Sequence, residues 1–338
     1  MSLQNEWYIA CESRGLQRKP VAVRMFATDF VLWRNSQGAA QCAVDRCAHR
    51  NAPLSQGFVK EDCLVCPYHG WQYDGHGQCQ RIPSLAEGRS IPASACIPTR
   101  QVREMNGYVW ICPGEPPASE PRAFPHCDEP GWTTFRMKTR FASNVEACLE
   151  NFLDCPHTAT VHRGWFRNPD PREMDAVVRK GTDFVEVDFQ NEPTTDSVIA
   201  RLFYPKNCHL QHTDRFLMPN LSRVDYRFDD RHHFIITSQA TPVEELITDV
   251  YTVISFCYGR IGWLVRLIFE PMSRHIIQQD VDILKLQGTN LKRFGGPEYT
   301  HVETDLIALH VQSMRRRAER GEPPPSNETS EKRIRIRF

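Results

Sequence analysis

The stretches CAH (residues 47–49) and CPYHGW (residues 66–71), sixteen residues apart, decide the fold of this chain. Each of them supplies one thiolate and one imidazole, spaced as C-x-H in the first and as C-x-x-H in the second. A 2Fe-2S cluster can be held in this way, with two cysteines on one iron and two histidines on the other. We therefore expect a cluster bound by Cys47, His49, Cys66 and His69 at the tips of two loops.

Zinc is the alternative occupant, because it also accepts two cysteines and two histidines in a tetrahedral site. Zinc sites favour C-x2-4-C beside H-x3-5-H, whereas each half-site here mixes one thiolate with one imidazole. Cys63 forms a C-x-x-C pair with Cys66 and keeps the zinc interpretation open, but the sequence has no second such pair to match it. The spacing favours the cluster.

DRCAHRNAPLSQGFV (residues 45–59) and CPYHGWQYDGHGQC (residues 66–79) resemble the Rieske domain of Rieske non-haem iron oxygenases. Respiratory-chain Rieske proteins add a cysteine pair that joins the two loops and a serine hydroxyl directed at a bridging sulfide. Ala52, Tyr68 and Trp71 stand at the corresponding positions here. Because hydrogen bonds to the sulfurs set the potential of such a cluster, we expect a low-potential cluster of the oxygenase kind.

Length and composition bound the remaining possibilities. A chain of 338 residues is long enough for two domains, each with its own core. Its net charge of zero gives no electrostatic reason to expect nucleic acid as a partner. Thirteen cysteines at irregular spacing are typical of reduced thiols in the cytoplasm rather than of a disulfide framework. The first residues, MSLQNEWY, have neither a basic nor an apolar leader region, so we expect no targeting segment.

One apolar stretch, VYTVISFCYGRIGWLVRLIF (residues 250–269), has the length of a membrane span. It contains Arg260 and Arg266, and Gly259 and Gly262 interrupt it, all of which weaken a spanning helix. We expect a buried strand that runs into an amphipathic helix, and we do not expect membrane association.

The N-terminal part reads as short strands separated by turns, from residue 7 to about residue 112. Turn-forming sequences occur at NSQG (residues 35–38) and GHG (residues 75–77), which makes His76 an exposed turn residue rather than a ligand. The proline-rich segment PGEPP (residues 113–117) is a natural boundary. The sequence therefore predicts an antiparallel β domain over residues 1–115.

A second candidate centre follows the sequence SNVE (residues 143–146), which predicts a capping box in which the Ser143 hydroxyl and the Glu146 carboxylate satisfy each other's free amides. The helix predicted after it covers ACLENFLDCPHTATVH (residues 147–162). Helical spacing then puts Asp154 and His157 on one face.

His157 and His162 are candidates for two ligands of a mononuclear iron, because two histidines and one carboxylate form the facial triad of non-haem Fe(II) oxygenases. The H-x4-H spacing alone is a weak signal in a chain with 13 histidines. Pro156 interrupts the predicted helix just before His157, so His162 need not follow straight-helix geometry. However, Asn151, Asp154, His157 and His162 together resemble the N-x-x-D-x-x-H-x4-H signature of the same oxygenase family.

Helical periodicity selects the third ligand from IIQQDVDILKLQ (residues 276–287). Asp280 lies in the middle of the apolar stripe, whereas Asp282 shares a solvated face with Gln279. A buried, unpaired carboxylate costs several kcal/mol, so Asp280 needs a cation, which iron would supply. The family has an aspartate in a similar helix; a salt bridge to Arg274 is the alternative.

The rest of the C-terminal half predicts an α+β domain over residues 116–320. Residues 185–254 alternate apolar and polar side chains, as expected for an antiparallel sheet. Residues 302–320 predict an amphipathic helix. The resemblance implies a helix-grip fold, in which the sheet and a long C-terminal helix enclose the substrate. Residues 321–338 are expected to form a solvated tail, with an edge strand at KRIRIRF (residues 332–338) as the alternative. We expect four other histidines to be strand or loop residues rather than ligands, namely His209, His212, His232 and His233.

The two centres explain each other chemically. Insertion of one oxygen atom from O2 consumes two electrons, and one ferrous ion readily supplies only one, so a second electron store is needed. The resemblance implies an oxygenase component that takes electrons from NAD(P)H through a ferredoxin or flavin reductase. The substrate would be a small, largely apolar organic molecule that is hydroxylated or demethylated. By length the chain is similar to the branch that includes dicamba O-demethylase and vanillate demethylase.

Asp154 is the residue expected to join the centres. Its carboxylate is predicted to accept the second N–H of His157, which would fix the tautomer of the ligand. The resemblance further implies a head-to-tail homotrimer, in which Asp154 of one subunit meets His69 of the next. Two alternatives stay open: an electron-transfer protein whose second domain only docks a partner, and an oxygenase of this type that performs desaturation.

Overall fold

The computed structural model describes residues 3–114, 119–127, 129–165, 173–190, 192, 198–205, 210–229, 231–323 and 329–337. The chain divides into two compact units, an N-terminal unit over Ser2–Ala123 and a C-terminal unit over Phe124–Phe338. The boundary predicted after residue 115 falls outside the described residues, as does His209.

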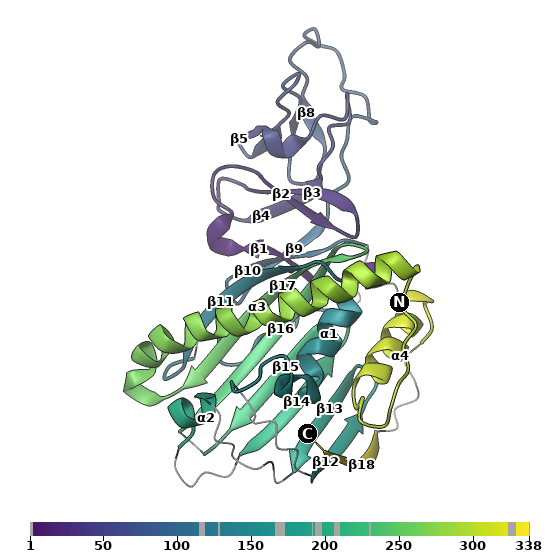
Figure 1. The fold of residues 1–338 in the computed structure, drawn as a ribbon. Helices are drawn as coiled ribbons and strands as arrows, with labels where there is room; N and C mark the ends of the chain where they lie inside the picture. Colours follow the sequence, from purple (N-terminus) through teal and green to yellow (C-terminus); the bar gives the residue numbers. More distant parts are fainter. Residues whose placement is uncertain are drawn as a thin grey trace. The chain divides into compact units, whose positions relative to one another are not determined.

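The N-terminal unit consists of three small antiparallel sheets (Figure 1). Their orders are β1-β10-β9, β2-β3-β4 and β5-β6-β7-β8. The strands are β1 (Tyr8–Glu12), β2 (Val21–Met25), β3 (Thr28–Arg34), β4 (Ala40–Val44), β5 (Phe58–Lys60), β6 (Cys63–Val65), β7 (Gln72–Tyr73), β8 (Cys79–Arg81), β9 (Gln101–Met105) and β10 (Tyr108–Cys112). Large aromatic side chains, Trp33 and Trp110 among them, are buried in the core of this unit.

The turns predicted in this unit are confirmed. Residues 35–38 connect β3 to β4, and residues 75–77 connect β7 to β8. The two cluster loops therefore extend from small, rigid sheets, one between β4 and β5 and the other between β6 and β7.

The C-terminal unit is built on one antiparallel sheet of eight strands, in the order β11-β17-β16-β15-β14-β13-β12-β18 (Figure 1). Its strands are β11 (Thr133–Phe141), β12 (Glu173–Lys180), β13 (Phe184–Gln190), β14 (Gln211–Leu217), β15 (Leu221–Arg227), β16 (His233–Glu244), β17 (Ile247–Cys257) and β18 (Ser330–Arg337). The alternation of polar and apolar residues predicted this sheet, and the α+β helix-grip prediction is confirmed.

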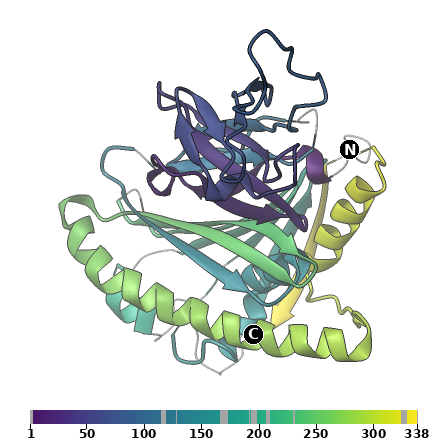
Figure 2. The same ribbon diagram turned by 90° about the horizontal axis from the view of Figure 1, so that it is seen from above.

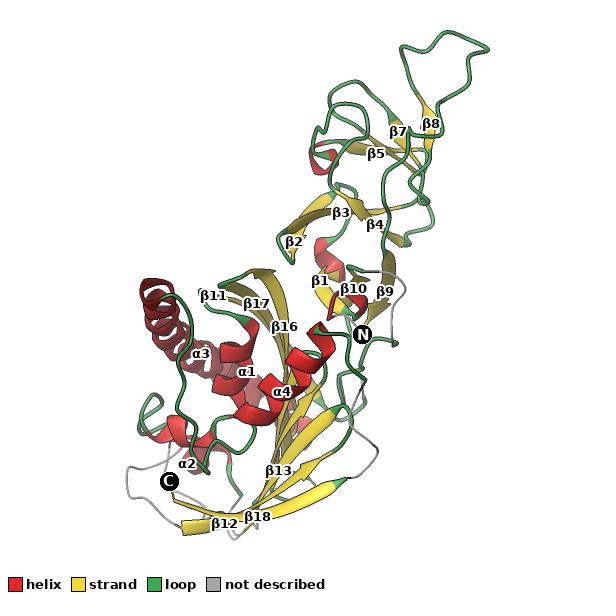
Figure 3. Ribbon diagram, turned by 90° about the vertical axis from the view of Figure 1, so that its right-hand side faces the viewer, coloured by secondary structure: helices red, strands yellow, loops and turns green. Residues whose placement is uncertain are grey.

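The helices of this unit are α1 (Val145–Leu153), α2 (Val198–Phe203), α3 (Gly262–Phe294) and α4 (Ala308–Glu319). Figure 3 shows α1, α3 and α4 on the same side of the sheet. Their buried apolar residues form the main cores with the inward-facing side chains of the strands, as in the clusters around Leu149 and around Phe269. One face of the sheet is therefore closed by helices, as the amphipathic patterns require.

The helix α3 is one 33-residue element that runs alongside the sheet (Figure 2). The predicted helix over residues 276–287 lies inside it, and the predicted strand followed by a helix at residues 250–269 is confirmed. No helix of the described residues is both long and apolar enough to cross a membrane. Gly288 lets α3 approach the backbone just before α1 closely, because a Cβ at this position would lie 2.2 Å from the Ala142 carbonyl oxygen.

The solvated tail expected after residue 320 is wrong for its last described part. Strand β18 pairs with β12, with Ile334 opposite Ala176 and Ile336 opposite Met174. Both isoleucines are buried, while Arg335 between them is exposed. The period-two alternation therefore places them on the core face of the protein's own sheet.

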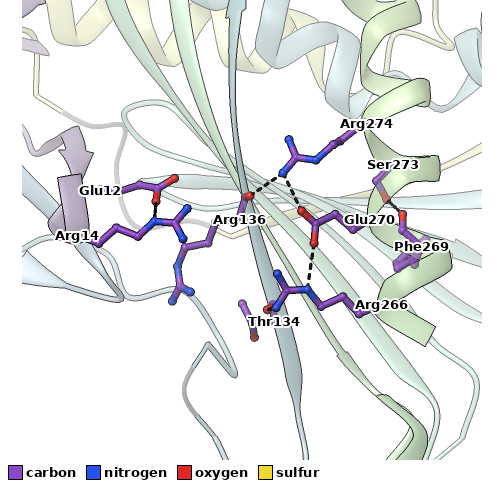
Figure 4. A network of polar contacts seen from close by, with 9 residues as sticks. All are labelled: Glu12, Arg14, Thr134, Arg136, Arg266, Phe269, Glu270, Ser273 and Arg274. Atoms are coloured by element: carbon purple, nitrogen blue, oxygen red, sulfur yellow. Dashed lines mark hydrogen bonds and ion pairs between the residues drawn. The ribbon is translucent and has the colours of Figure 1, made fainter. Parts of the chain in front are cut away.

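The opposite edge strand, β11, is covered by side chains of α3 (Figure 4). Arg266 donates to the Thr134 carbonyl at 3.3 Å, and Arg274 donates to the Arg136 carbonyl at 3.4 Å. Glu270 holds both guanidinium groups, at 3.0 and 2.8 Å. Charged side chains on an edge strand prevent it from pairing with another chain.

Candidate metal centres

The two cluster loops are copies of one turn. In each loop the amide of the cysteine donates to the carbonyl five residues later, at 2.9 Å for Cys47 and 2.8 Å for Cys66. The carbonyl of the same cysteine accepts from the amide four residues later, at 2.9 Å from Asn51 and 3.1 Å from Gly70. Asn51 and Gly70 both have the left-handed backbone conformation, with φ of 58° and 71°. Each turn presents its cysteine and its histidine to the same region.

The four predicted cluster residues fit a 2Fe-2S group. Cys47 and Cys66 are buried, and the rings of His49 and His69 lie 4.5 Å apart. The Nδ1 atom of His49 is buried and has no hydrogen-bond partner in the described structure. Desolvation and the neighbouring His69 lower the pKa of His49, which favours the neutral imidazole that binds metals. Two thiols, two imidazoles and an orphaned ring nitrogen are the donor set that such a cluster needs.

Tyr73 contacts a cluster-ligand candidate and was not predicted from the sequence. Its hydroxyl lies 3.1 Å from Cys47 Sγ and accepts from the Ala48 amide at 3.2 Å. Because burial raises the pKa of Tyr73, the phenol keeps its proton and can donate it to the sulfur. A tyrosine four residues after the ligand candidate His69, at the end of a two-residue strand, was the available signal.

The structure brings together the three residues predicted to bind a mononuclear iron. Asp280 Oδ1 lies 3.1 Å from His162 Nε2 and 3.6 Å from His157 Nε2. The two imidazole Nε2 atoms lie 3.3 Å apart. His162 and Asp280 are almost fully buried, with 3% and 4% of their surface exposed. The ligand atoms of all three residues lie within 4.8 Å of one another.

This donor set fits a divalent cation with open coordination positions. Three electron-pair donors converge on one point, although like donors repel each other unless a cation lies between them. Burial raises the pKa of Asp280, but hydrogen bonds and charge interactions with His157 and His162 outweigh it and leave the pKa lowered. The alternative salt bridge to Arg274 is wrong, because Arg274 binds Glu270 instead.

The capping box predicted before α1 is wrong in its residues. Asn144, not Ser143, is the cap, and its side chain accepts from the Ala147 amide at 2.8 Å. Ser143 is fully buried, and Glu146 lies 3.6 Å from Arg315 rather than reaching back to the cap. An asparagine satisfies a helix start as well as a serine does, so the sequence left either residue available.

The helix predicted over residues 147–162 ends early. Helix α1 stops at Leu153, Asp154 has φ −91° and ψ 89°, and a 3-10 turn covers Cys155–Ala159. A proline has no amide for the α-helical hydrogen bond and its ring clashes with the carbonyl four residues earlier, so Pro156 ends α1 rather than bending it. The expectation that Asp154 and His157 share a helix face is therefore wrong.

The second ring nitrogen of His157 is bound by the backbone. Nδ1 donates to the carbonyl oxygen of Asp154, while the Asp154 carboxylate lies 3.9 Å away. The carboxylate prediction is wrong for this contact, because the 3-10 turn folds the carbonyl back onto the ring. The Asp154 side chain is 45% exposed, and partial burial raises its pKa. It lines a cavity of about 680 Å³ together with His157 and Glu298.

Gln279 holds the other ligand candidate. Its Oε1 lies 2.8 Å from His162 Nδ1, so the amide oxygen accepts the Nδ1–H and leaves the lone pair of Nε2 free to bind a metal. Gln279 was expected on a solvated face, and this expectation is wrong. Its position next to Asp280 was the only signal available, since periodicity does not say what α3 meets.

A further buried histidine, His212, resembles a ligand only in composition. Its Nδ1 lies 2.6 Å from Glu192 and its Nε2 lies 2.9 Å from Asp214, with Cys155 nearby. Burial lowers the pKa of His212, but the two carboxylates raise it to about 9. Both ring nitrogens are therefore used in an ion triad, and His212 is a strand residue, as expected. His233 begins β16, and His232 precedes it in a loop.

Comparisons with known proteins cover most of the chain. Residues 6–99 match the Rieske [2Fe-2S] domain, and residues 141–321 match the vanillate O-demethylase oxygenase C-terminal domain. Aminopyrrolnitrin oxygenase PrnD of Pseudomonas fluorescens is 32% identical over 93% of this chain and 91% of its own length.

Other relatives match over a shorter span. The oxygenase component of dicamba O-demethylase from Stenotrophomonas maltophilia is 34% identical over 53% of this chain. The match covers 54% of that relative, so the chain spans about half the length of this relative. A dicamba monooxygenase structure with 3,6-dichlorosalicylic acid has a TM-score of 0.81 at 22% identity, covering 94% of this chain and 98% of that one. The Pseudomonas putida NdmA structure with caffeine has a TM-score of 0.79 at 21% identity, covering 94% and 91%. These structures share the fold.

Proposed function

Because the chain belongs to the Rieske non-haem iron oxygenases with a vanillate O-demethylase-type catalytic domain, we propose that it is the oxygenase component of a multicomponent system. It uses O2 and electrons from NAD(P)H to hydroxylate or oxidatively demethylate a small, largely apolar organic substrate. The observation that carries this proposal is the convergence of His157, His162 and Asp280 beside a mostly apolar cavity.

The residues have separate tasks in this proposal. Cys47, His49, Cys66 and His69 hold the cluster, and His157, His162 and Asp280 hold the mononuclear iron. When bound, the cluster supplies one stored electron and the iron supplies an open position for O2. The Asp154 carbonyl and the Gln279 amide fix the ring orientations of the two histidines, so that their Nε2 atoms stay directed at one point.

The alternative function, an electron carrier with a docking domain, does not require the second group of ligands. A carrier gains nothing from burying Asp280 beside two imidazoles, whereas an oxygenase needs all three side chains. PrnD, the relative that matches over nearly the full length, is named as an oxygenase. The two candidates differ in iron content, with three irons per chain in the oxygenase and two in the carrier.

Iron analysis of the purified protein tests the proposal. We expect about three irons per chain and the EPR signal of a reduced cluster. His157→Ala should lower the iron content by one and leave the cluster signal unchanged, while substrate-dependent O2 uptake with a reconstituted reductase is lost. Two irons per chain in the unmodified protein would contradict the proposal.

Electron transfer between subunits is the finer part of the proposal. We assign Asp154 to a contact with His69 of the neighbouring subunit in a head-to-tail homotrimer, with a ferredoxin or flavin reductase as the electron donor. His69 is exposed on its unit and the Asp154 side chain is 45% exposed on its own, which supports this assignment. A heterologous contact of this kind closes into a ring only when the rotation fits. A cytoplasmic location stays a prediction from the cysteine content.

Asp154→Asn tests the bridge without removing the iron, because the Asp154 carbonyl rather than its carboxylate binds His157. We expect unchanged iron content and slower oxidation of the reduced cluster by O2 and substrate, by roughly 10- to 100-fold. Glu298→Gln removes the same charge from the wall of the 680 Å³ cavity and is the matched control. Equal rates in both variants would show that Asp154 is not the bridge.

A further inference from the structure

A small cavity lies between the candidate iron ligands and the sheet. It has a volume of about 120 Å³, and His157, His162 and Asp280 form part of its wall. The remaining wall comes from α1, from the 3-10 turn after it, from α3 and from the strands β11, β15, β16 and β17. A cavity of about 150 Å³ accepts benzene in an engineered protein, so this volume corresponds to about one ring.

The strand register arranges the sheet side of this cavity into rows. Ser222, Ser238 and Thr252 are direct neighbours across β15, β16 and β17. The next row on the same face, two residues away on each strand, consists of Val224, Ile236 and Ile254. All six residues line the cavity, and successive rows on one face lie about 7 Å apart. The wall therefore changes from hydroxyl groups to aliphatic groups within the length of one ring.

The hydroxyl row has spare hydrogen-bonding capacity. Ser238 Oγ and Thr252 Oγ1 lie 2.9 Å apart, so one of them donates to the other and the acceptor keeps its own O–H. Both side chains are buried, at 4% and 3% exposure. Ser273, which lines the same cavity from α3, differs because its hydroxyl donates to the Phe269 carbonyl at 2.8 Å (Figure 4). The Ser238–Thr252 pair is therefore able to bind a polar group of a ligand.

In the part of the chain that the structure describes, the same wall offers no lysine or arginine to an anion. Among the described residues that line the cavity, the acidic and basic side chains are His157, His162 and Asp280, which are the candidate iron ligands. An ionised carboxylate or sulfonate that entered would lose its hydration without meeting a lysine or an arginine. A neutral amide, ketone, ether or alcohol would lose much less and would meet the hydroxyl row.

We infer that the substrate of this site is an uncharged molecule of about one ring that directs a single hydrogen-bonding group at Ser238 and Thr252. These two residues set the specificity for that group. That the ligand is a substrate rests on the proposed oxygenase function, whereas the chemistry of the ligand is inferred from the cavity alone.

Binding of three one-ring probes to the iron-loaded protein tests the inference. Benzamide is neutral and polar, benzoate is the charged molecule of the same shape, and toluene has no polar group. We expect calorimetry or ligand-induced thermal shifts to show benzamide binding at least about tenfold more tightly than benzoate near neutral pH. Between about pH 8 and pH 7, benzoate affinity should rise about tenfold, because only the protonated acid enters, while that of benzamide stays constant.

Variants then assign the effect to the hydroxyl pair. Thr252→Val keeps the shape of the side chain and should weaken benzamide binding by roughly three- to tenfold, while toluene binding is unchanged. Ser238→Ala should act in the same way. Ser273→Ala is the matched control and should change neither affinity, because the Ser273 hydroxyl is used inside α3.

Three results would overturn the inference: benzoate binding as tightly as benzamide, no binding of benzamide or toluene at millimolar concentration, and equal losses for benzamide and toluene in Thr252→Val. Failure of the oxygenase function is distinguishable from these. It would appear as a missing mononuclear iron or as O2 uptake that no ligand stimulates, while the order of probe affinities stays as expected.

Discussion

Replacement of Tyr73 by phenylalanine removes one hydroxyl from the cluster environment and leaves the ring in place. That hydroxyl lies 3.1 Å from Cys47 Sγ, and the Ala48 amide donates to its oxygen at 3.2 Å, so its proton is directed at the sulfur. Reduction of a bound cluster adds negative charge, and a hydrogen bond to the sulfur stabilises the reduced form more than the oxidised form. Tyr73→Phe should therefore lower the reduction potential.

The size of the shift follows from the energy of the bond. A hydrogen bond to a charged group contributes about 1.5–3 kcal/mol, and we take about 1 kcal/mol as the difference between the two redox states. For a one-electron couple, 59 mV corresponds to a tenfold change in the equilibrium, or about 1.4 kcal/mol. The expected shift is then about −40 mV.

A redox titration of the iron-loaded protein, followed by EPR or visible circular dichroism, measures this shift. Tyr68→Phe is the matched control, because Tyr68 lies on the cluster loop that leads into β7 but is 66% exposed. A change of less than about 10 mV in Tyr73→Phe, an upward change, or an equal change in Tyr68→Phe would refute the reasoning.

Three further predictions concern the C-terminal unit. Gln279→Leu should weaken iron binding by roughly 10- to 100-fold with an unchanged cluster signal, and iron retention against a chelator measures this; full retention would contradict the role of Gln279. Asp249 binds Arg140 at 2.6 Å, and its pKa is lowered because this contact and others outweigh burial. Because its pKa is lowered in the folded state, Asp249 stabilises the fold above about pH 4. This stabilisation is lost as the pH falls through the pKa of the folded state. Asp249→Asn should thus lower the Tm by about 2–4 °C at neutral pH and by less near pH 3, and a pH-independent difference would argue against the linkage. Ile336→Ser should destabilise the sheet by about 3 kcal/mol in thermal unfolding, whereas Arg335→Ser on the exposed face should have little effect; similar losses would mean that β18 does not bury its isoleucines.

Local sequence patterns predicted the ligand candidates better than the contacts around them. Helical periodicity separated Asp280 from Asp282, and the structure buries the first and exposes the second. The same periodicity misjudged Gln279, because the segment that carries His162 approaches α3 from a side that no pattern along α3 describes. Residues next to each other in a helix differ in direction by about 100°, so two neighbours can both face a site that lies between them.

Errors at the ends of elements have a similar origin. The segment around His157 was expected to be a helix that Pro156 interrupts, whereas α1 already ends at Leu153 and a 3-10 turn follows it. The alternation in residues 332–338 indicated a strand, but its partner, β12, lies more than a hundred residues earlier in the chain. Pairing over that distance depends on the whole sheet, which local periodicity does not reveal.

Two neighbouring residues of the long helix α3 contribute to the iron site of this protein. Asp280 faces the site directly, and Gln279 holds the ring of His162, so α3 cannot turn about its axis without releasing both contacts. A bound metal would thus restrict the rotation of this 33-residue helix about its axis. Its removal should be felt as faster amide hydrogen exchange far along α3, well beyond the atoms that touch the ion.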